Sequence, residues 1–508
     1  MNVCRWIEWW ADRMPYKTAI RFEGASLSYR ELADDIDRTA GALRQLGIRR
    51  GSRVAWLGFN SPEFLSAFFA CARIGAIIVP LNFRLAPREH LFMLRNAGAK
   101  VLIFDPRLGT TAELVAQKRK SCTLVTSTDA PHACASESLP ELKLSADIGT
   151  HVASTQPDDP LLIIYTSGTT GRPKGAVLTH RSIHWNGLNS QLMHDLHRDD
   201  KVLTTLPFFH VGGLNIQTTP ALQVGATVTL IEKFQPSTFL TLVEKERPTL
   251  TVLVPTQMQA VTAHPRWHDT DFSSLRCVTT GSTMVQMPLL NLWHDHGIPV
   301  IQIYGCTESG PIAIHQVVET AHTTAGSVGR PAMYCDVRIV DGKNKDVTDG
   351  EAGEILLRGP NMFVEYWKDP DASNVALKKN WFHTGDVGRC DEQGCYHIVD
   401  RKKRMIISGG ENIYPSEVER ILSEHPAVSE CAVVGIPHDK WGEVPVAAIV
   451  CAEGPPPEAD DLLQIFDGRL GHLKHPRHFV PFDELPRNAM GKVVFSELQA
   501  MIVKRIAN

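Results

Sequence analysis

A run of glycine and hydroxyl-bearing residues with one lysine, at residues 165–175, has the chemistry needed to bind phosphate. It lies between the apolar segments Leu161–Ile164 and Ala176–Thr179, which are short enough to be buried strands. Glycines let backbone N–H groups approach a ligand closely, and hydroxyl and ammonium groups add donors suited to phosphate oxygens. No Walker A pattern can be read through the run, and a flexible surface turn is the alternative. Because donors are dense and acidic residues absent, we predict a polyphosphate-binding loop formed by Thr166, Ser167, Gly168, Thr169, Thr170, Gly171 and Lys174.

The loop resembles, over ten consecutive positions, the phosphate loop of the adenylate-forming superfamily, which includes acyl-CoA synthetases, luciferases and carrier-protein adenylation domains. A second stretch, Tyr304-Gly-Cys-Thr-Glu308, follows the strand candidate Val300–Ile303 and is similar to the superfamily's Y-G-x-T-E. Tyr304 offers an aromatic face to adenine, Thr307 a hydroxyl to the α-phosphate, and Glu308 a hard oxygen ligand suited to Mg²⁺. A tyrosine and a glutamate beside a turn are often structural, but their occurrence together with the loop favours a functional role.

Two further stretches resemble nucleotide contacts of this superfamily. Trp381-Phe-His-Thr-Gly-Asp386 is similar to W-x-x-T-G-D, and the Asp386 carboxylate can accept hydrogen bonds from both ribose hydroxyls. The resemblance makes Arg401 the second ribose contact. Residues 280–283 lie where relatives often have Gly-Gly-Ala-Pro and contact adenine, and the threonines at both ends depart from that pattern. The adenine contacts implied here are Gly281, Ser282 and Thr283.

The stretch Pro486-Arg-Asn-Ala-Met-Gly-Lys492 resembles the superfamily's P-x-x-x-x-G-K, whose lysine reaches the site from a small C-terminal domain. An ammonium at Lys492 can neutralise charge on the attacking carboxylate and on the α-phosphate, which is electrostatic rather than covalent catalysis. A Gly-Lys pair near a chain end is usually solvated. Its presence after three other motifs, in the superfamily's order, favours a catalytic lysine.

The acid and the thiol also have candidate residues. Residues 207–213 resemble the superfamily's substrate-side motif and make His210 a gate or a carboxylate contact, with a hydrogen-bonded core histidine as the alternative. No Lys or Arg is close in sequence to the apolar pocket candidates, so a fatty or aromatic monoacid fits better than a diacid. The pocket candidates are Phe208, Phe209, Val211, Leu214, Gly310 and Ile312. The residues that resemble the coenzyme A path are Ser408, Gly409, Gly410 and Trp441.

Length and composition limit the class of protein. A chain of 508 residues exceeds one simple core, and 43% hydrophobic residues with 21% charged residues are ordinary for a globular protein. A net charge of −4 gives no electrostatic argument for nucleic acid binding. The eleven cysteines form no C-x-x-C pair, which favours reduced thiols and a cytoplasmic location. Charged residues in the first 14 positions exclude a signal-peptide core, and prolines and glycines interrupt the uncharged segment 202–231, so no membrane span is predicted.

The order of apolar segments predicts the fold class. Strand candidates alternate with helical patterns through residues 1–330, as in Arg53–Gly58 followed by a helix starting at Ser61-Pro62, which implies largely parallel sheets covered by helices. Residues 135–160 are polar and weakly patterned and are expected to form a surface connection. Arg338–Val340 and Glu354–Arg358 indicate a β-rich subdomain. We predict an α/β protein with a large N-terminal domain of stacked mixed or parallel sheets at 1–400, a hinge at 401–404 pivoting at Lys403, and a small mobile α+β domain at 405–508.

The resemblance covers essentially the whole chain and implies an AMP-forming acid–CoA ligase, with fatty acid metabolism as one setting. ATP with Mg²⁺ would activate the acid as acyl-AMP, and coenzyme A would then displace AMP. A stand-alone enzyme that loads a carrier protein, a luciferase-like oxygenase and a non-catalytic nucleotide or acyl-adenylate sensor are the alternatives. The expected partners are a small carboxylic acid, ATP and coenzyme A, without nucleic acid; a homodimer and peripheral membrane association are left open.

Overall fold

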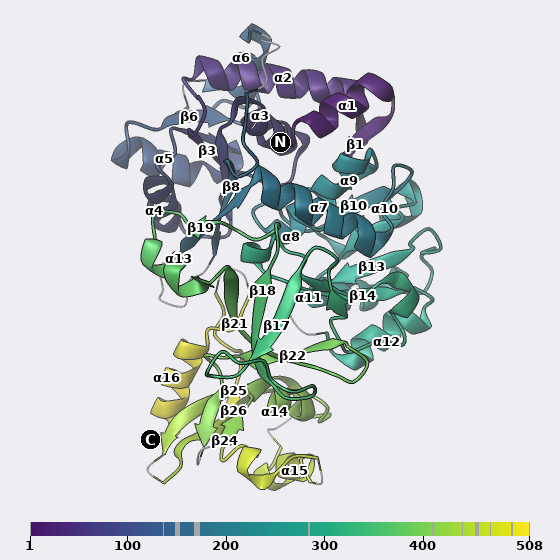
Figure 1. Cartoon of the computed structure of the whole chain (residues 1–508), viewed down its shortest axis with the longest axis vertical. Coiled ribbons are helices and arrows are strands. Elements are labelled where there is room, and N and C mark those ends of the chain that lie inside the picture. Colours follow the sequence, from purple (N-terminus) through teal and green to yellow (C-terminus); the bar gives the residue numbers. More distant parts are fainter. Residues whose placement is uncertain are drawn as a thin grey trace. The chain divides into compact units, whose positions relative to one another are not determined.

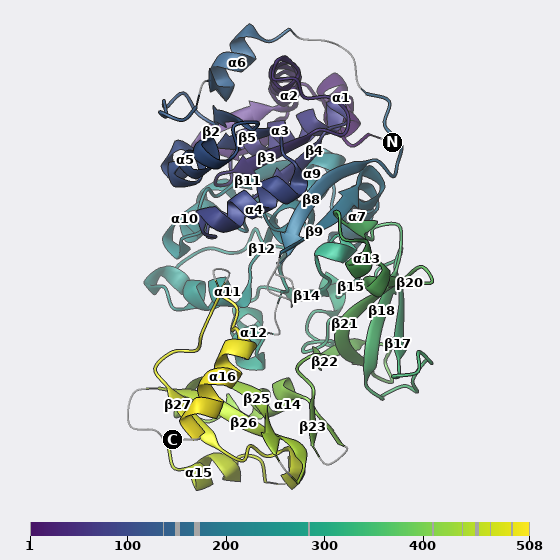
Figure 2. The same ribbon diagram turned by 90° about the vertical axis from the view of Figure 1, so that its left-hand side faces the viewer.

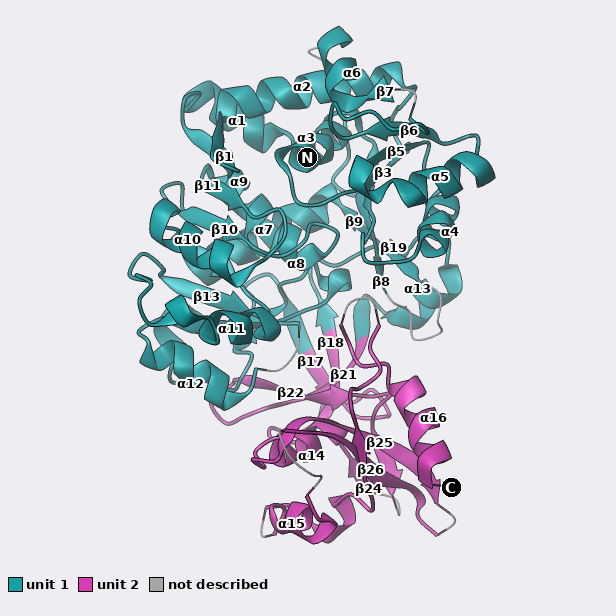
Figure 3. Cartoon of the chain, turned by 180° about the vertical axis from the view of Figure 1, so that it is seen from behind, with its two compact units in different colours: residues 1–337, 357–383 teal, residues 338–356, 384–508 magenta. Residues whose placement is uncertain are grey.

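The computed structural model describes residues 2–135, 137–147, 153–166, 173–282, 285–408, 411–438, 440–452, 457–467, 469–488 and 491–506. Within these ranges the chain divides into two compact units, drawn in different colours in Figure 3. The first unit is Met1–Val337 with Leu357–His383, and the second is Arg338–Leu356 with Thr384–Asn508. The predicted domain boundary at residue 400 and the hinge at 401–404 stay predictions.

The first large sheet is parallel from β14 to β1 and antiparallel at both edges. Its central strands are buried throughout, as expected for parallel strands covered on both faces. Their positions confirm the strands predicted between residues 202 and 303. In spatial order the sheet contains β16 (Arg330–Pro331), β15 (Ile314–His315), β14 (Val300–Tyr304), β13 (Cys277–Thr280), β12 (Leu250–Val252), β10 (Lys201–Thr204), β11 (Thr227–Leu230), β1 (Thr18–Phe22) and β2 (Ala25–Ser28).

The second large sheet also belongs to the first unit. Its pairs from β7 to β8 are parallel, whereas β8, β9 and β19 pair antiparallel. The sheets are therefore mixed, as predicted. In spatial order this sheet contains β19 (Glu365–Tyr366), β9 (Lys174–Thr179), β8 (Pro160–Thr166), β4 (Ile77–Pro80), β3 (Arg53–Leu57), β5 (Val101–Phe104), β6 (Thr123–Thr126) and β7 (Glu137–Ser138).

Helices connect and cover these strands (Figure 1). The predicted start of α3 is confirmed, because Ser61 Oγ accepts a hydrogen bond from the backbone N–H of Phe64 at 3.4 Å and Pro62 is the first helical residue. The expected surface connection at 135–160 is wrong in part, since it contains β7 and α6. The helices of the first unit are α1 (Arg5–Arg13), α2 (Tyr29–Gln45), α3 (Pro62–Ile74), α4 (Pro87–Ala97), α5 (Gly109–Lys118), α6 (Leu139–Ser145), α7 (His180–His194), α8 (Val211–Asn215), α9 (Thr218–Val224), α10 (Pro236–Glu246), α11 (Pro255–Thr262), α12 (Met287–Asp295) and α13 (Pro370–Ala376).

Two smaller sheets follow in the chain. In the first, β17 (Asp336–Val340), β18 (Gly353–Arg358), β21 (Trp381–Cys390) and β20 (Leu377–Lys378) lie side by side, and β22 (Tyr396–Arg401) pairs with β21 (Figure 2). The second sheet contains β24 (Glu411–Ile413), β23 (Ile406–Ser408), β26 (Gly442–Cys451) and β25 (Val428–His438), with β27 (Phe479–Phe482) on β26. Its helices are α14 (Pro415–Leu422), α15 (Ala459–Gln464) and α16 (Phe495–Ile506). The predicted β-rich segment and α+β C-terminal part are thus confirmed.

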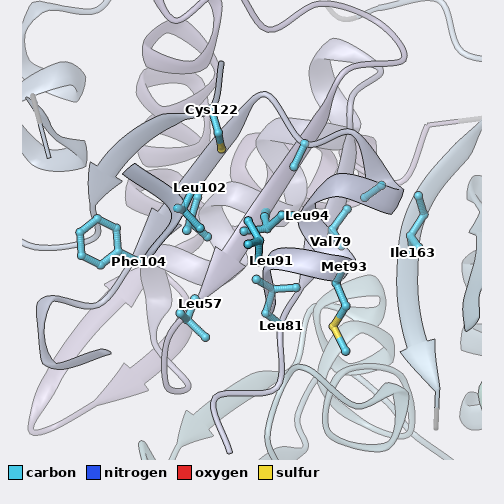
Figure 4. Close-up of a cluster of buried hydrophobic side chains, with 14 of the residues drawn as sticks. Leu57, Val79, Leu81, Leu91, Met93, Leu94, Leu102, Phe104, Cys122 and Ile163 are labelled. Atoms are coloured by element: carbon cyan, nitrogen blue, oxygen red, sulfur yellow. The ribbon is translucent and has the colours of Figure 1, made fainter. Parts of the chain in front are cut away.

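A buried apolar cluster anchors the second large sheet (Figure 4). Leu94 of α4 and the side chains of Leu102 and Phe104 on β5 belong to it, and each has an exposed fraction of 0%. None of the described helices combines the length and apolarity that a membrane crossing requires.

Replacing Leu94 by Ala should lower the free energy of unfolding by about 2–5 kcal/mol, because the core cannot fully close over the cavity. Leu144→Ala is the matched control, since Leu144 is 82% exposed and its loss should change stability by less than about 0.5 kcal/mol. Denaturant unfolding followed by tryptophan fluorescence measures both. Equal effects of the two substitutions would contradict the assignment of Leu94 to a packed core.

Candidate active site

The strands β8 and β9 form an antiparallel hairpin that carries both ends of the predicted phosphate loop. Thr166 lies opposite Lys174 in the register, and Thr166 Oγ1 is 3.4 Å from the carbonyl oxygen of Lys174. The ends of the loop therefore meet, as expected of a turn between two paired strands. Ser167, Gly168, Thr169, Thr170 and Gly171 lie outside the described residues.

The hairpin is anchored on one side by Tyr165. Its hydroxyl donates to Asn96 Oδ1 of α4 at 2.6 Å. A Cβ at Gly175, opposite it in the register, would lie 2.8 Å from Ile163 Cγ2 and 3.3 Å from the Tyr165 ring. Only glycine lets β9 pass this ring so closely.

The Tyr304–Glu308 motif forms a sharp turn at the end of β14. Residues Thr307–Ser309 make one turn of 3-10 helix, and Tyr304 and Glu308 are buried while Thr307 is half-buried. A Cβ at Gly305 would lie 1.7 Å from the carbonyl oxygen of Pro311, so the turn requires glycine. The motif's backbone thus fixes where the Glu308 carboxylate lies.

Tyr366, a residue that the sequence analysis missed, contacts this carboxylate. Its hydroxyl donates to Glu308 Oε1 at 2.6 Å. Burial and the Glu308 charge raise the pKa of Tyr366, so the hydroxyl keeps the proton that it donates. Lys174 Nζ lies 5.2 Å from the centroid of the Tyr366 ring, a cation–π distance. Tyr366 therefore connects the cation of one predicted motif to the carboxylate of the other.

Residues 361–367, which we call the bridging segment, hold the two motifs together through the backbone. The N–H of Phe363 donates to the carbonyl oxygen of Glu308 at 2.7 Å. The N–H of Trp367 donates to the carbonyl oxygen of Gly175 at 2.7 Å, beside the end of the phosphate loop. Between these bonds, β19 pairs antiparallel with β9. The bridging segment joins the hairpin and the Glu308 turn into one site.

The predicted adenine stretch lies at the end of β13, the parallel neighbour of β14. A Cβ at Gly281 would lie 2.9 Å from Ile303 Cγ1 and 3.1 Å from the carbonyl oxygen of Ile303, so Gly281 packs directly against β14. Ser282 follows with φ of 75°. The structure thus brings Gly281 beside the strand that ends at Tyr304. Thr283 lies outside the described residues.

Aromatic rings of the substrate-side motif pack against rings from other parts of the first unit. The Phe208 ring stacks on Phe64 with centroids 5.1 Å apart. The Phe209 ring meets Phe83 edge-on at 5.1 Å and lies 4.7 Å from the His210 ring. Both predicted phenylalanines are buried, as are Val211 and Leu214 on α8.

Asn60, missed in the sequence, holds this motif in place. Its Nδ2 donates to the carbonyl oxygens of Leu206 and Ile231 at 3.0 and 3.1 Å, and its Oδ1 accepts from the N–H of Phe208 at 2.9 Å. Asn60 has an exposed fraction of 3%, and it follows β3 of the second sheet. The amide therefore ties the substrate-side loop of one sheet to the other sheet.

Asn186 of α7 brings the other pocket candidates to α8. Its Nδ2 donates to the carbonyl oxygen of Asn215 at the end of α8 at 2.7 Å, and its Oδ1 accepts from the N–H of Ile312 at 3.1 Å. Gly310 precedes this contact with φ of 91°, which favours glycine. The stretches 211–215 and 310–312, distant in sequence, are thereby held side by side.

Arg84 adds a positive charge that sequence order did not reveal. The pocket was expected to lie far from Lys and Arg residues, but the Arg84 guanidinium carbon lies 5.6 Å from the Phe83 ring and 5.8 Å from the Phe209 ring. The guanidinium is carried there by the loop between β4 and α4. The Phe83 and Phe209 rings therefore have a cation beside them.

The second unit carries the predicted ribose pair. Asp386 of β21 lies opposite Arg401 of β22, and Arg401 Nε is 3.0 Å from Asp386 Oδ1. Asp386 is buried, whereas the Arg401 side chain is 64% exposed. An ion pair with so exposed a partner contributes little stability, about 0–1 kcal/mol. The pair nevertheless holds the Asp386 carboxylate in one orientation.

Lys492 lies on a tight turn of the same unit. Its backbone N–H donates to Asn488 Oδ1 at 3.1 Å, and the N–H of Asn488 donates to the carbonyl oxygen of Lys492 at 2.9 Å. Although the side chain is accessible to solvent, surrounding protein and the nearby Arg401 cation lower the pKa of the Lys492 amine, and Asp386 opposes that shift. The structure thus brings Lys492 close enough to the ribose pair for their charges to act on it.

The residues predicted for the coenzyme A path lie on the C-terminal sheet. Ser408 of β23 pairs with Gly442 of β26 and is buried; within the described ranges its Oγ has no hydrogen-bond partner. Trp441 is half-buried and precedes β26. The Lys440 ammonium lies 4.9 Å from the centroid of the Trp441 ring. Ser408 and Trp441 therefore lie near each other, where the end of β23 pairs with the start of β26. Gly409 and Gly410 lie outside the described residues.

The side chains present fit a magnesium ion that is bound together with phosphates. Among the described residues, no group of three or more His, Cys, Asp or Glu side chains could form a metal cage. Mg²⁺ commonly binds through one or two carboxylates and completes its shell with water and substrate phosphates. The buried Glu308 carboxylate, held by Tyr366, would be such a ligand.

Comparisons with known proteins agree with this geometry. The chain is 47% identical to indoleacetate–CoA ligase of Aromatoleum aromaticum over 99% of both chains, and 41% identical to feruloyl-CoA synthase of an Amycolatopsis species over 96% of both. Among solved structures, o-succinylbenzoate CoA synthetase (MenE) of Bacillus subtilis with its acyl-adenylate intermediate is 31% identical, with a TM-score of 0.87 and 97% of each chain covered. The same synthetase is also solved with ATP and a magnesium ion.

Family models cover most of the chain. The model of the AMP-binding enzymes matches residues 7–367, and that of the AMP-binding enzyme C-terminal domain matches residues 417–492. The first match includes the phosphate loop, the Tyr304–Glu308 turn and the bridging segment, and the second ends at Lys492. The chain therefore belongs to the family of AMP-binding enzymes.

Proposed function

We propose that this protein activates an aromatic monocarboxylic acid and transfers the acyl group to coenzyme A. It is an AMP-forming acid–CoA ligase, which uses ATP and Mg²⁺ to make acyl-AMP and pyrophosphate and then forms the thioester with release of AMP. The main support for an aromatic substrate is that a relative 47% identical over 99% of both chains is an indoleacetate–CoA ligase. The cluster of aromatic rings formed by Phe83, Phe209 and His210 supports it, because flat rings pack well against other aromatic rings.

The residues of the chain take distinct roles in this proposal. Tyr304 stacks on adenine, Asp386 and Arg401 hold the ribose, and Thr307 donates to the α-phosphate. Lys492 stabilises the charge on that phosphate as the carboxylate attacks. His210 lies at the carboxylate, where its ring is already held against Phe209.

Magnesium, when bound, would neutralise phosphate charge and thereby make pyrophosphate a better leaving group. Glu308 would hold it, and the phosphate loop would hold the nucleotide beside it. Adenylation needs no covalent bond to the protein, so catalysis depends on the positions of charged groups.

We also propose a cytoplasmic location and keep a homodimer as a prediction. The location is supported by eleven cysteines, all of them free, because reduced thiols are typical of that compartment. The oligomeric state in solution, measured by light scattering, tests the dimer.

A panel of acids tests the substrate proposal. Arylacetic and arylpropenoic acids should release pyrophosphate with a higher kcat/KM than straight-chain fatty acids of equal carbon number. Adding coenzyme A should then yield a thioester, and adding a holo carrier protein instead should not. Preference for fatty acids, or transfer to the carrier protein alone, would contradict the proposal.

Lys492→Ala should separate the two half-reactions. Loss of an electrostatic donor costs roughly 10²–10³-fold in kcat, and the adenylation rate should fall at least that far. Thioester formation from preformed acyl-AMP should stay near the wild-type rate. Lys504→Ala, which removes an exposed lysine of α16, is the control and should change neither step. Equal damage to both steps would contradict the catalytic role.

The lowered pKa of Lys492 adds a pH dependence. The amine stabilises the α-phosphate only while protonated, so adenylation should fall as pH rises through its pKa, below the ordinary lysine value of about 10.4. The pyrophosphate-release rate measured against pH should show this alkaline decline. A Lys492→Arg variant should shift the decline to higher pH, because the guanidinium stays charged.

The hinge remains a proposal, supported by the contacts around residues 402–405. Lys402 is tied to β21 through its N–H, which donates to the carbonyl oxygen of Gly385 at 2.8 Å. Arg404 is tied to the C-terminal part through Glu419 and lies 3.8 Å from the Phe495 ring centroid. Lys403, between them, is exposed and lies outside both neighbouring strands. A backbone rotation at Lys403 would change the direction of the chain between β22 and β23 without breaking the pairing of either strand.

Lys403→Pro tests that rotation. Proline fixes φ near −65° and also restricts Lys402, so one orientation should be retained and the other lost. We expect ATP–pyrophosphate exchange to persist and thioester formation from acyl-AMP to fail. Lys403→Ala is the control and should support both. Normal rates for both steps in the proline variant would place the pivot elsewhere.

A further inference from the structure

A hydrogen bond inside the first unit occupies part of the carboxylate that our proposed function gives to magnesium. The Tyr366 hydroxyl donates to Glu308 Oε1 at 2.6 Å, a length typical of a strong bond to a charged acceptor. Both side chains are buried, with exposed fractions of 9%. A buried carboxylate held at one oxygen cannot rotate freely about its last torsion.

The tyrosine is itself fixed from several directions. Its ring packs against Phe363 with centroids 4.9 Å apart, and the Lys174 ammonium lies over its face. Its backbone pairs with Ala176 of β9, and its N–H donates to Ser373 Oγ at 2.9 Å. The hydroxyl is therefore held in position by the protein before any ligand arrives.

Tyr366 differs from an ordinary core residue, because it contacts both Lys174 and Glu308, which our proposed function places at the same nucleotide. Lys174 belongs to the phosphate loop and Glu308 to the turn that ends β14. Groups that orient a metal ligand typically change metal affinity by roughly 10–100-fold when removed. Because the hydroxyl donates to Oε1, binding of one metal ion by both oxygens would compete with that hydrogen bond, and Oε2 is the oxygen more available to a metal.

We propose that Tyr366 is a positioning residue that presents Glu308 as a one-oxygen ligand and thereby sets the preference for magnesium over larger cations. The inference rests on the proposed metal role of Glu308. Mg²⁺ requires near-octahedral geometry with single-oxygen carboxylate ligands, whereas Ca²⁺ accepts two oxygens of one carboxylate at longer distances. Removing the hydroxyl that binds Oε1 should therefore lower the affinity for Mg²⁺ more than the affinity for Ca²⁺.

The test uses Tyr366→Phe, which removes the hydroxyl and keeps the ring with its contacts to Phe363 and Lys174. Binding of Mn²⁺, an octahedral oxygen-binding substitute for Mg²⁺, is followed by electron paramagnetic resonance of free Mn²⁺ with α,β-methylene-ATP present. Mg²⁺ and Ca²⁺ are then added as competitors. We expect Mn²⁺ and Mg²⁺ affinities to fall roughly 10–100-fold, and Ca²⁺ affinity to fall less. Metal-free binding of AMP, measured by calorimetry, should be unchanged.

Two controls separate this role from a structural one. Tyr29→Phe makes the same change at a buried tyrosine whose hydroxyl donates to the carbonyl oxygen of Ala226 at 2.7 Å, and it should alter no metal affinity. Glu308→Gln should abolish the metal preference on its own. A double variant with both Tyr366→Phe and Glu308→Gln should bind Mn²⁺ no more weakly than Glu308→Gln alone, because the two residues act through one interaction.

The outcomes are distinguishable. If the wild-type protein binds no Mn²⁺ beyond that held by the nucleotide analogue, the proposed role of Glu308 is wrong. If wild type and Glu308→Gln behave as expected but Tyr366→Phe matches wild type, the positioning inference alone is overturned. A Tyr366→Phe variant that loses AMP and Mn²⁺ binding equally would show that the hydroxyl only supports the fold.

Discussion

The backbone hydrogen bonds of the bridging segment are the constraint on which the rest of the site depends. Buried N–H and C=O groups must be paired, and residues 361–367 pair with the Glu308 turn at one end and with β9 at the other. The segment cannot shift toward one motif without losing bonds to the other. Two loops that belong to different sheets are therefore held at a set separation by an extended strand, which is stiffer than a side-chain contact. The carboxylate, the loop lysine and the aromatic ring between them follow from that placement.

Much of the fold could be predicted because its signals are local. A short apolar run such as Val300–Ile303 is buried in any parallel sheet, and β14 occupies Val300–Tyr304. In a Ser-Pro pair the serine supplies an N-cap and the proline a fixed φ suited to a helix. Helix α3 accordingly begins at Pro62. The catalytic motifs follow directly after such strands, so their placement at the carboxyl ends of strands could be inferred as well. Helix α6 had equally local signals: Ser138 Oγ accepts from the N–H of Glu141 at 3.2 Å, but the surrounding polar residues obscured it.

The rest could not be predicted, because partners distant in sequence leave no periodic trace. Tyr366 lies 58 residues from Glu308, and Asn60 lies 148 residues from Phe208. Nothing in the local pattern around either residue points to its partner: the aromatic run near Tyr366 indicates a short strand, and Asn60 reads as a residue before a helix cap. Arg84 is the clearest case. The apolar pocket candidates have no Lys or Arg near them in the sequence, and only folding brings Arg84 to the Phe209 ring. Sequence order identifies the groups that touch a substrate more readily than the groups that orient them.

In the proposed function, the charges around Lys492 allow the bound nucleotide to help set the charge of the lysine. In the second unit two cations, Arg401 and Lys492, act near one carboxylate, Asp386, so positive charge is in excess there. Surrounding protein and the like charge of Arg401 lower the pKa of the amine in the protein without ligand. A triphosphate carries the opposite charge, and its approach raises the pKa of any amine beside it by the same electrostatic rule. In our proposal the lysine therefore holds its proton most firmly when a phosphate is next to it, which is when the proposed adenylation step needs a full positive charge. In the proposed mechanism the charge of the nucleotide offsets the effect of surrounding protein and of Arg401 on the amine, so the substrate helps to set the protonation state of the group that stabilises its transition state.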